Sequence, residues 1–362
     1  MAARIRVLRW AVLAVVVAML ALVAPVGAHR DVALASRGTE LIPAVPAPVD
    51  PAGLIAQVEP GLVQVTTMVD YQGVVGNGTG IVLSPDGEIL TNHHVIQGAN
   101  SIQVLSIATG QTFEADVIGY DRDDDIALLR ARGAAGLPVA PLGDSASVAI
   151  GDPVLTIGNA NGTGNPLTHE QGVVTELGRS IDAQDELTGS SHQLGDLIAS
   201  STNLRSGDSG GALVNGAGQI VGLNAAATLN FKMGRSTPGG EGFAIPINKA
   251  LGIANQIRSG APSATVHIGP SAMLGVGISA GGRNQEAGLP VRSILRDGPA
   301  DQVGLRPGDV IISIDGTPIG SANALTAVLD QRYPGNVIDL SWLDAAGQNR
   351  DAKVTLGSGP VS

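Results

Sequence analysis

The sequence predicts a mainly β protein, with a large domain of short strands followed by a smaller domain of mixed α and β structure. Short apolar runs recur between glycine-rich turns from about Ala52 to Asn248. The 362 residues include 50 glycines and 21 prolines, which supply many turns. After about residue 270, strand and helix patterns alternate within a shorter span. Many short strands at regular spacing indicate a sandwich or a barrel, so we expect such a domain first and a small α+β domain second.

The first 28 residues have the pattern of a cleavable secretory signal peptide. A start with three arginines precedes an almost unbroken apolar run from Trp10 to Ala24. Small residues follow at positions 26–28, where a signal peptidase cuts. The run is shorter than the about 20 apolar residues of a membrane span. We therefore expect an exported protein, secreted or held in the cell envelope, with no stable membrane span after cleavage.

Composition excludes several classes of partner and cofactor. The formal net charge of −11 argues against nucleic acid and anionic membranes as partners. The chain has no cysteine and no His-Glu-x-x-His pattern, so zinc is poorly supported and no metal or cofactor is expected. Aromatic residues make up only 2% of the chain. The cores must therefore be built from Val, Ile, Leu and Ala.

The first domain is expected over residues 52–258, after an extended arm over 29–51 that is rich in Pro, Ala and Val. Apolar runs that fit strands are 80–83, 116–119, 151–158, 172–175 and 218–223. Lys249 to Ser259 has helical periodicity and good helix formers. Residues 259–270 contain Gly, Pro and Ser and are expected to form a linker.

The second domain is expected over residues 271–357. Its expected elements, in order, are a strand start over 274–278, a short helix over 299–303, a strand over 310–314, a helix over 321–331 and two closing strands over 337–342 and 351–356. Gly304 is expected to end the first of these helices. Asp315-Gly316 after the third element is a strong hairpin signal. The pattern favours a small sheet with two helices.

Residues 207–211 read Gly-Asp-Ser-Gly-Gly, which makes Ser209 a candidate nucleophile. Glycine adopts backbone conformations that are closed to other residues. Ser209 can therefore sit on a sharp turn that aims nearby N–H groups at one point, where a developing oxyanion would be held. The alternative is a plain glycine–serine turn, so the motif needs context.

A histidine and an aspartate supply that context. His94 ends the Thr-x-x-His pattern of trypsin-like families, which begins here at Thr91, and Asp125 directly precedes the apolar run 126–129. A serine hydroxyl needs a neutral imidazole to take its proton, and a carboxylate must orient that imidazole. The order His, Asp, Ser is that of chymotrypsin-type triads. We predict His94 as the base and Asp125 as its orienting carboxylate.

The neighbours of these two residues are expected to have other roles. Adjacent side chains point in different directions, so His93 is expected to be exposed or hydrogen-bonded elsewhere. Asp121, Asp123 and Asp124 are expected to be solvated, because only Asp125 stands at the mouth of a buried strand.

The acidic cluster has an alternative interpretation as a calcium loop, which we reject. Asp121, Asp123 and Asp125 have the alternate spacing of an EF-hand start. However, Ile126 stands where glycine is required, and Arg132 stands where the closing glutamate belongs.

These motifs together resemble the HtrA-type secreted serine proteases with one PDZ domain, of the mycobacterial PepA kind. The resemblance covers nearly all of the mature chain. In the first domain it depends on His94, Asp125 and Ser209 and on the segment 241–246, which resembles the end of HtrA protease domains. In the second it depends on the segment 298–316, a strong PDZ signature.

The resemblance implies a chymotrypsin-like double antiparallel β-barrel with the triad between the barrels. It also implies that the N–H groups of Gly207 and Ser209 form an oxyanion hole. Substrates would be unfolded or damaged proteins. The PDZ loop at Leu274, Gly275 and Val276 would bind a peptide C-terminus, with the peptide added as a strand. Relatives commonly form homo-trimers, although no residue here specifies one.

The chain departs from the family pattern beside the nucleophile. Many HtrA relatives have asparagine there, whereas this chain has Asp208. In trypsin-like zymogens that aspartate pairs with a freed amino terminus, but no activation sequence is visible here. Arg205 and Arg179 are candidate partners. The loop from Tyr71 to Asn77 is short, so the long regulatory loop of some relatives is expected to be absent.

Specificity is predicted from residues near the nucleophile. Asn203, six residues before Ser209, stands where trypsin-like enzymes place an aspartate. The opposite wall is expected from Asn224, Ala225 and Ala226, with Ala227 beyond. A small, uncharged pocket suits Val, Ala, Ile or Leu at the cleavage site.

Two other functions remain to be distinguished from proteolysis. A proteolytically silent chaperone or peptide-binding scaffold would use the PDZ domain alone, but the intact triad argues against it. A lipase or esterase is disfavoured because the chain lacks a suitable Gly-x-Ser-x-Gly elbow and has the wrong triad order.

Overall fold

The computed structural model describes residues 50–69, 74–162, 166–184, 191–225, 241–278 and 288–361. The expected signal peptide and nearly all of the expected arm lie outside these residues. So do residues 71–73 of the loop expected from Tyr71 to Asn77, whereas residues 74–77 belong to a strand. Among the helices of the described residues, none has the length and apolar composition needed to span a membrane.

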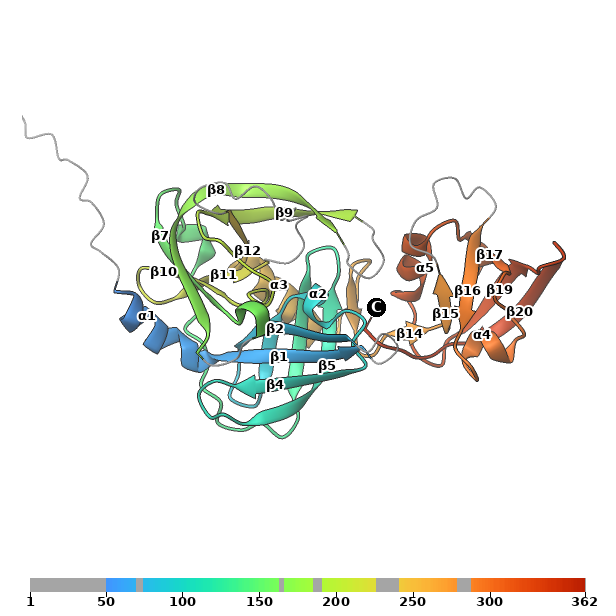
Figure 1. Ribbon diagram of the computed structural model, residues 1–362, viewed down its shortest axis with the longest axis horizontal. Helices are drawn as coiled ribbons and strands as arrows, with labels where there is room; N and C mark the ends of the chain where they lie inside the picture. Colours follow the sequence, from blue (N-terminus) through green and yellow to red (C-terminus); the bar gives the residue numbers. More distant parts are fainter. Residues whose placement is uncertain are drawn as a thin grey trace, which may run out of the picture. The chain divides into compact units, whose positions relative to one another are not determined.

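The first barrel is built from six antiparallel strands (Figure 1). They are β1 (Leu62–Val69), β2 (Val74–Val82), β3 (Glu88–Thr91), β4 (Ser101–Ser106), β5 (Thr112–Asp121) and β6 (Ile126–Ala131). The strand order is β5-β4-β1-β2-β3-β6, and pairing of β5 with β6 closes the ring. Alternate residues of β1 and its neighbours, such as Val63 and Val65, are fully buried inside. This period of two is what a barrel wall requires.

Two short helices of this part were not predicted. Helix α1 (Pro51–Val58) begins within the segment that was expected as an arm, and the Asp50 side chain caps it by accepting from the amide of Ala52. Helix α2 (His93–Ile96) is a single turn directly after β3. A 3-10 turn, η1 (Glu59–Gly61), joins α1 to β1.

The second barrel is also closed and has six strands, in the order β10-β11-β12-β9-β8-β7. They are β7 (Pro153–Gly158), β8 (Thr168–Gln184), β9 (Ser191–Ser200), β10 (Ala212–Asn215), β11 (Ile220–Asn224) and β12 (Gly242–Pro246). Figure 1 shows β8 and β9 as long strands running side by side, in agreement with their pairing. Two 3-10 turns, η2 (Ser145–Ser147) and η3 (Ala160–Gly162), flank β7. The chymotrypsin-like double barrel predicted from the resemblance is confirmed.

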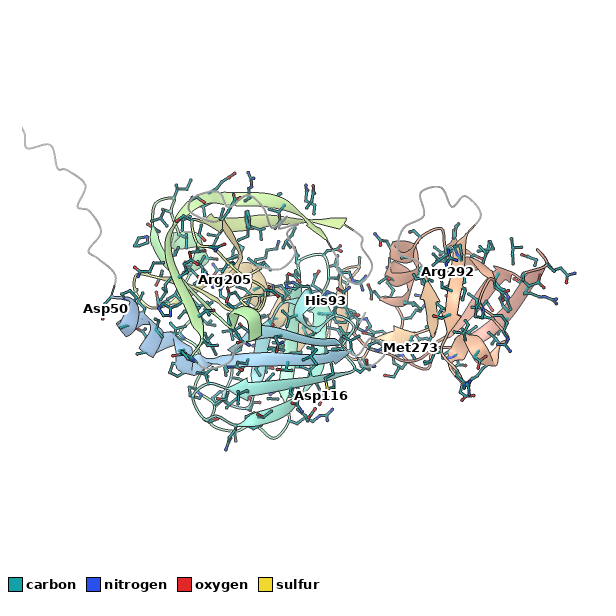
Figure 2. All side chains as sticks on the ribbon, in the orientation of Figure 1. Asp50, His93, Asp116, Arg205, Met273 and Arg292 are labelled. Carbon is teal, nitrogen blue, oxygen red and sulfur yellow. The ribbon has the colours of Figure 1, made fainter. Side chains whose placement is uncertain are left out.

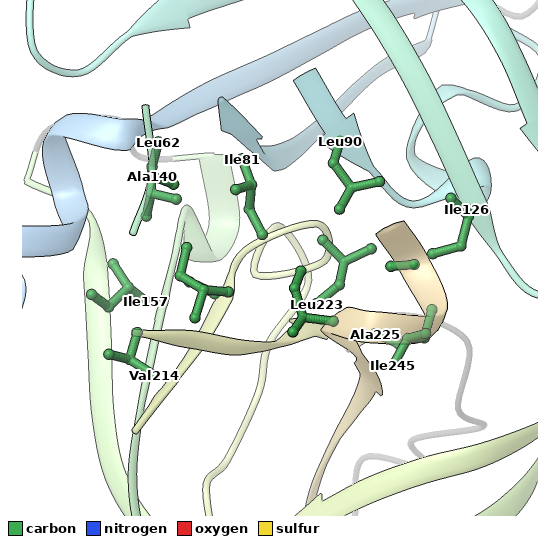
Figure 3. Packing of buried hydrophobic residues seen from close by; sticks show 14 of the residues in the cluster. Leu62, Ile81, Leu90, Ile126, Ala140, Ile157, Val214, Leu223, Ala225 and Ile245 are labelled. Atoms are coloured by element: carbon green, nitrogen blue, oxygen red, sulfur yellow. The ribbon is translucent and has the colours of Figure 1, made fainter. Parts of the chain in front are cut away.

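One hydrophobic cluster joins the facing sides of the two barrels (Figure 3). Leu62, Ile81 and Leu90 come from the first barrel, and Leu223 and Ile245 from the second. All five are fully buried. Each such side chain contributes about 1.5–3 kcal/mol relative to an exposed one. This shared core fixes the first barrel against the second, and therefore fixes side chains placed at the seam.

Helix α3 (Ile247–Arg258) follows the second barrel, close to its predicted range. The next segment, expected as a linker, contains strand β13 (Val266–Ile268), which pairs antiparallel with β5. Val266 and His267 of this strand are buried. The part of the segment nearest the second domain is therefore integrated in the sheet of the first barrel.

The second domain has its own sheet and its own core. A sheet in the order β15-β16-β17-β19-β20 contains β15 (Val276–Ile278), β16 (Leu289–Ile294), β17 (Val310–Ile314), β19 (Val337–Leu343) and β20 (Asn349–Thr355), and β18 (Thr317–Pro318) pairs with β17. A separate pair joins β14 (Ala272–Met273) to β21 (Gly357–Ser358). Helices α4 (Pro299–Gln302) and α5 (Ala322–Leu329) lie within two residues of their predicted ranges.

Candidate active site

Ser209 lies on a tight turn between Leu204 and β10 that only glycines at key positions allow. Gly207 and Gly210 have φ angles of 95° and 79°, in the region that favours glycine. A Cβ atom on Gly210 would collide with the carbonyl oxygen of Thr79. The turn is closed by bonds from the Gly210 amide to the carbonyl of Asn224 (2.9 Å) and from Gly211 to Asp208 (3.0 Å).

Three polar groups of the turn, one hydroxyl and two amide N–H groups, are available to a substrate. The Ser209 hydroxyl is buried and has no hydrogen-bond partner among the residues that the structure describes. Within the same ranges, the amide N–H groups of Gly207 and Ser209 donate to no backbone or side-chain acceptor. Buried donors without protein partners are rare, so their presence beside a serine points to a site that binds an external acceptor.

His94 and Asp125 form a doubly bonded pair. The imidazole Nδ1 of His94 lies 2.8 Å from Oδ2 of Asp125, and the His94 amide donates to Oδ1 at 2.9 Å. The side chain of Asp125 is 3% exposed and that of His94 is 17% exposed. With Nδ1 donating to the carboxylate, Nε2 is left as the acceptor, which is the tautomer a general base needs.

The local backbone presents Asp125 to the histidine. Asp125 has a φ of 55°, an uncommon conformation for a residue with a side chain. The side-chain amide of Asn92 donates to its carbonyl at 2.9 Å. Burial by itself raises the pKa of the Asp125 carboxyl, but the charge and hydrogen bonds of His94 outweigh it, so the pKa lies below its ordinary value. The carboxyl is therefore ionised at neutral pH.

Thr79 connects the nucleophile turn to the strand that leads to His94. Its amide donates to the carbonyl of Ser209 at 2.8 Å, and its hydroxyl donates to the carbonyl of Gly207 at 2.9 Å. The hydroxyl of Thr91, three residues before His94, donates to the carbonyl of Thr79 at 2.7 Å. Sequence analysis missed Thr79, because a threonine in an apolar strand carries no signal of a contact 130 residues away.

The neighbours of the pair differ in part from expectation. His93, labelled in Figure 2, is 3% exposed, and its ring lies 4.8 Å from that of Tyr120, so the first of the two expected alternatives, exposure, does not hold. Asp121 was expected to be solvated but is 2% exposed. It accepts from the Asp124 amide and the Thr265 hydroxyl, and burial raises its pKa. Asp124 lies 2.6 Å from the Lys249 ammonium. The described residues contain no cluster of side chains that fits a metal ion.

Asp208 makes different contacts from the two that were considered. Its Oδ2 accepts from the backbone amide of Arg205 at 2.9 Å, and its Oδ1 lies 2.8 Å from the hydroxyl of Thr168. The guanidinium of Arg179 instead lies 3.3 Å from Glu176. Among the described residues, neither arginine side chain forms an ion pair with Asp208. Burial raises the pKa of Asp208, although the hydrogen bonds lower it in part.

The residues predicted to line the specificity pocket divide between two places. Asn203 lines a pocket of 320 Å³ together with Thr168, Arg205 and Asp208. Asn224 is fully buried, and its side-chain amide donates to the carbonyl of Ala212 at 3.2 Å. This bond holds the Asn224 side chain against β10, next to the nucleophile turn. Ala225 is buried beside it, and Ala226 and Ala227 lie outside the described residues.

The loop predicted to bind a carboxylate precedes the edge strand β15. Gly275 has a φ of 80°. The carbonyls of Leu274 and Gly275 accept from Ala300 and Leu295, at 3.0 and 2.9 Å. The side chain of Leu274 is buried. Strand β15 pairs only with β16 within the described part of the chain, so its other edge is available for a further strand.

Comparison with known families agrees with this geometry. A model of the trypsin-like peptidase domain matches residues 78–223, and a model of the PDZ domain matches residues 263–342. The double barrel with its His94–Asp125 pair and the following domain thus define a trypsin-like serine peptidase that carries a PDZ domain.

Relatives identify the family. The serine protease PepD of Mycobacterium tuberculosis is 32% identical over 330 residues, which are 87% of this chain and 68% of the relative. The serine endoprotease DegS of Escherichia coli is 34% identical, over 72% of this chain and 71% of the relative. The serine protease Do-like HtrA of Lactobacillus helveticus is 31% identical, over 77% of this chain and 68% of the relative. The chain belongs to the HtrA-type serine proteases.

Proposed function

We propose that this protein is an exported endopeptidase that uses Ser209 as nucleophile, His94 as general base and Asp125 as the carboxylate that orients the base. The observations that carry the proposal are the doubly bonded His94–Asp125 pair and the buried Ser209 hydroxyl on a turn that Thr79 joins to the first barrel. In this arrangement Asp125 holds His94 in one tautomer and stabilises the imidazolium that forms during the reaction.

In the proposed reaction, the Ser209 oxygen attacks the scissile carbonyl carbon while its proton passes to Nε2 of His94. The carbonyl oxygen becomes an oxyanion, and the N–H groups of Gly207 and Ser209 donate to it. Collapse of this intermediate breaks the C–N bond, and His94 returns the proton to the leaving amine. Water then attacks the acyl-enzyme, again with His94 as the base, which restores the Ser209 hydroxyl.

Unfolded or damaged proteins are the proposed substrates, cut as extended segments. Asn203, which lines a pocket near the nucleophile turn, offers no charge to a basic side chain, so we expect Val, Ala, Ile or Leu at the cleavage site. The signal-peptide pattern, and relatives that are named periplasmic endoproteases, support action outside the cytoplasm. Binding of peptide C-termini by Leu274, Gly275 and Val276 would bring substrates or regulators to the PDZ domain.

The proposal is tested by labelling the purified mature chain with a fluorophosphonate and then digesting an unfolded protein. We expect label on Ser209, none on the Ser209→Ala variant, and fragments that end in small aliphatic residues. A folded wild-type chain that neither takes the label nor cleaves the unfolded protein would favour the alternative, a peptide-binding scaffold.

A further inference from the structure

Asp208 stands between the two residues whose amides would form the oxyanion hole, and it holds their turn together. Its amide donates to the carbonyl of Arg205 and its carbonyl accepts from Gly211, each at 3.0 Å. Its Oδ2 accepts from the Arg205 amide at 2.9 Å. The residue is 6% exposed. A change in the protonation of its carboxyl therefore acts directly on the turn that carries Ser209.

If Asp208 is ionised, the contacts of the Thr168 hydroxyl need one more proton than is available. The Thr168 hydroxyl lies 2.9 Å from the carbonyl of Gly158 and 2.8 Å from Oδ1 of Asp208. It also accepts from the Ala160 amide at 3.1 Å. A hydroxyl has a single proton. If Asp208 is ionised, one of the two short contacts joins two acceptors, or the proton is shared between them.

We propose that Asp208 is a positioning residue that works as a neutral carboxylic acid, donating its Oδ1 proton to Thr168. Thr168 then donates its own proton to the carbonyl of Gly158, and Oδ2 still accepts from Arg205. Every short contact becomes a hydrogen bond in a continuous chain from β7 to the nucleophile turn. The proposal concerns the working state of the turn, so its kinetic consequences depend on the role proposed for Ser209.

The surroundings of Asp208 agree with a neutral acid. Burial is the largest influence on its carboxyl and raises the pKa above its ordinary value. The titratable groups that share its pocket are Arg205, His169 and Glu170. The charge of Arg205 favours the ionised form, but this residue is exposed, so solvent screens its charge. The hydrogen bonds that Asp208 accepts from Arg205, Thr168 and the Ala160 amide also favour the ionised form, but burial outweighs them.

Asp208 lies so close to β7 that its carboxyl can take part in this series of hydrogen bonds. A Cβ atom on Gly158 would lie 2.6 Å from Oδ1 of Asp208. The carboxyl thus reaches the backbone of β7 with no side chain between. Ionisation would place a negative charge on Oδ1 beside the Thr168 hydroxyl, whose other short contact is the Gly158 carbonyl. We expect ionisation at high pH to loosen the turn and to lower activity, although His94 is then deprotonated and ready to act as the base.

The direct test is carboxyl NMR on the full chain, labelled with ¹³C in aspartate and carrying Ser209→Ala to prevent self-digestion. The Asp208 signal is assigned by its loss in a double variant that also carries Asp208→Asn. If that variant does not fold, the signal is assigned by its shift in a double variant that carries Thr168→Val instead. We expect it to stay protonated to a higher pH than the signals of the exposed aspartates, whose ordinary pKa is about 3.9. Titration together with the exposed aspartates would overturn the proposal. This readout needs no activity, so it is independent of the proposed function.

The kinetic test compares Asp208→Asn and Asp208→Ala in the active chain. Asparagine imitates the neutral acid, since its amide can donate to Thr168 and accept from Arg205. We expect kcat/KM for an unfolded substrate within about threefold of wild type for Asp208→Asn, and a loss of at least about tenfold for Asp208→Ala. Only wild type should lose activity at high pH. Asp123→Asn, at an exposed site, controls for the change in net charge. An equal loss in both Asp208 variants would show that the charge itself is required.

Discussion

The amide of Thr79 donates to the carbonyl of Ser209 at 2.8 Å, a bond between a strand of the first barrel and the nucleophile turn of the second. Thr79 is itself fixed, because its carbonyl accepts from the Thr91 hydroxyl. His94 and Ser209, from different barrels, are therefore held in register by hydrogen bonds that do not involve their own side chains. The hydrophobic seam between the barrels supports the same alignment.

Replacing Ser209 by alanine should abolish peptide hydrolysis and leave the fold intact, because one small buried side chain replaces another. Loss of the nucleophile costs about 10⁴-fold or more in turnover. The check is the rate of cleavage of an unfolded protein, with thermal unfolding as the control for structure. Turnover near the wild-type rate in a clean preparation would refute the mechanism.

Replacing His94 by alanine should be as damaging as Ser209→Ala, whereas His93→Ala should affect stability instead. His93 is buried against Tyr120, so its truncation should cost about 1–3 kcal/mol of unfolding free energy. Activity per folded molecule should be largely retained. Both are measured by combining active-site titration with thermal melts. If His93→Ala abolishes turnover and His94→Ala retains it, the base is His93 and the assignment is wrong by one residue.

Asp125 should contribute stability that depends on pH. Its pKa is lowered in the folded state, so folding favours the ionised form. The contribution is complete above the ordinary aspartate pKa of about 3.9 and is lost as the pH falls through the lower folded value. The stability gap between wild type and Asp125→Asn should narrow on acidification. Denaturant melts from neutral to acidic pH measure this gap, with Asp123→Asn as the exposed control. A gap that is constant with pH would mean that His94 does not stabilise the charge.

Gly210→Ala should eliminate activity and destabilise the fold. Both the φ of 79° and the collision with the Thr79 carbonyl oppose a side chain there. Gly133→Ala is a matched control, with a φ of 70° and no atom within 4 Å of the added Cβ. The control should lose only the about 1–2 kcal/mol of a left-handed residue and keep full turnover. Equal losses in the two variants would mean that the contact with Thr79 is unimportant.

Amidating the C-terminus of a peptide that binds the PDZ domain should weaken its binding. The loop at 274–276 would donate backbone N–H groups to the terminal carboxylate, and a hydrogen bond to a charged group contributes about 1.5–3 kcal/mol. The Kd should rise at least about tenfold. Titration calorimetry on the full Ser209→Ala chain measures both forms of the peptide. Equal affinities would indicate that the domain binds internal segments.

Local patterns predicted much of the fold. Apolar runs predicted the positions of strands such as β7 and β17, and the helical period predicted α3 and α5. The one-turn helix α2 was missed because four residues cannot display a period. Strand β13 was missed because a three-residue strand within a Gly, Pro and Ser context depends on its partner β5 for its existence.

The site was predictable where chemistry and spacing coincide. The His94–Asp125 pair formed as expected, since each residue stands at the end of a recognisable strand. The contacts of Asp208 with Thr168, and the commitment of Asn224 to the barrel wall, were not predictable. The first joins residues 40 positions apart in the chain, and the second depends on the direction of a side chain within the β10–β11 pair; no local pattern encodes either.

Strand β13 also decides where the chain can be divided. Residues 119–121 of β5 pair with β6 along one edge and with 266–268 along the other. A protease fragment that stops at Arg258 would leave this second edge bare, together with the Asp121 carboxyl that Thr265 now caps. Exposed edges of this kind recruit strands from other molecules. An autonomous catalytic fragment must therefore extend through Ile268, and shorter versions should precipitate or self-associate during purification.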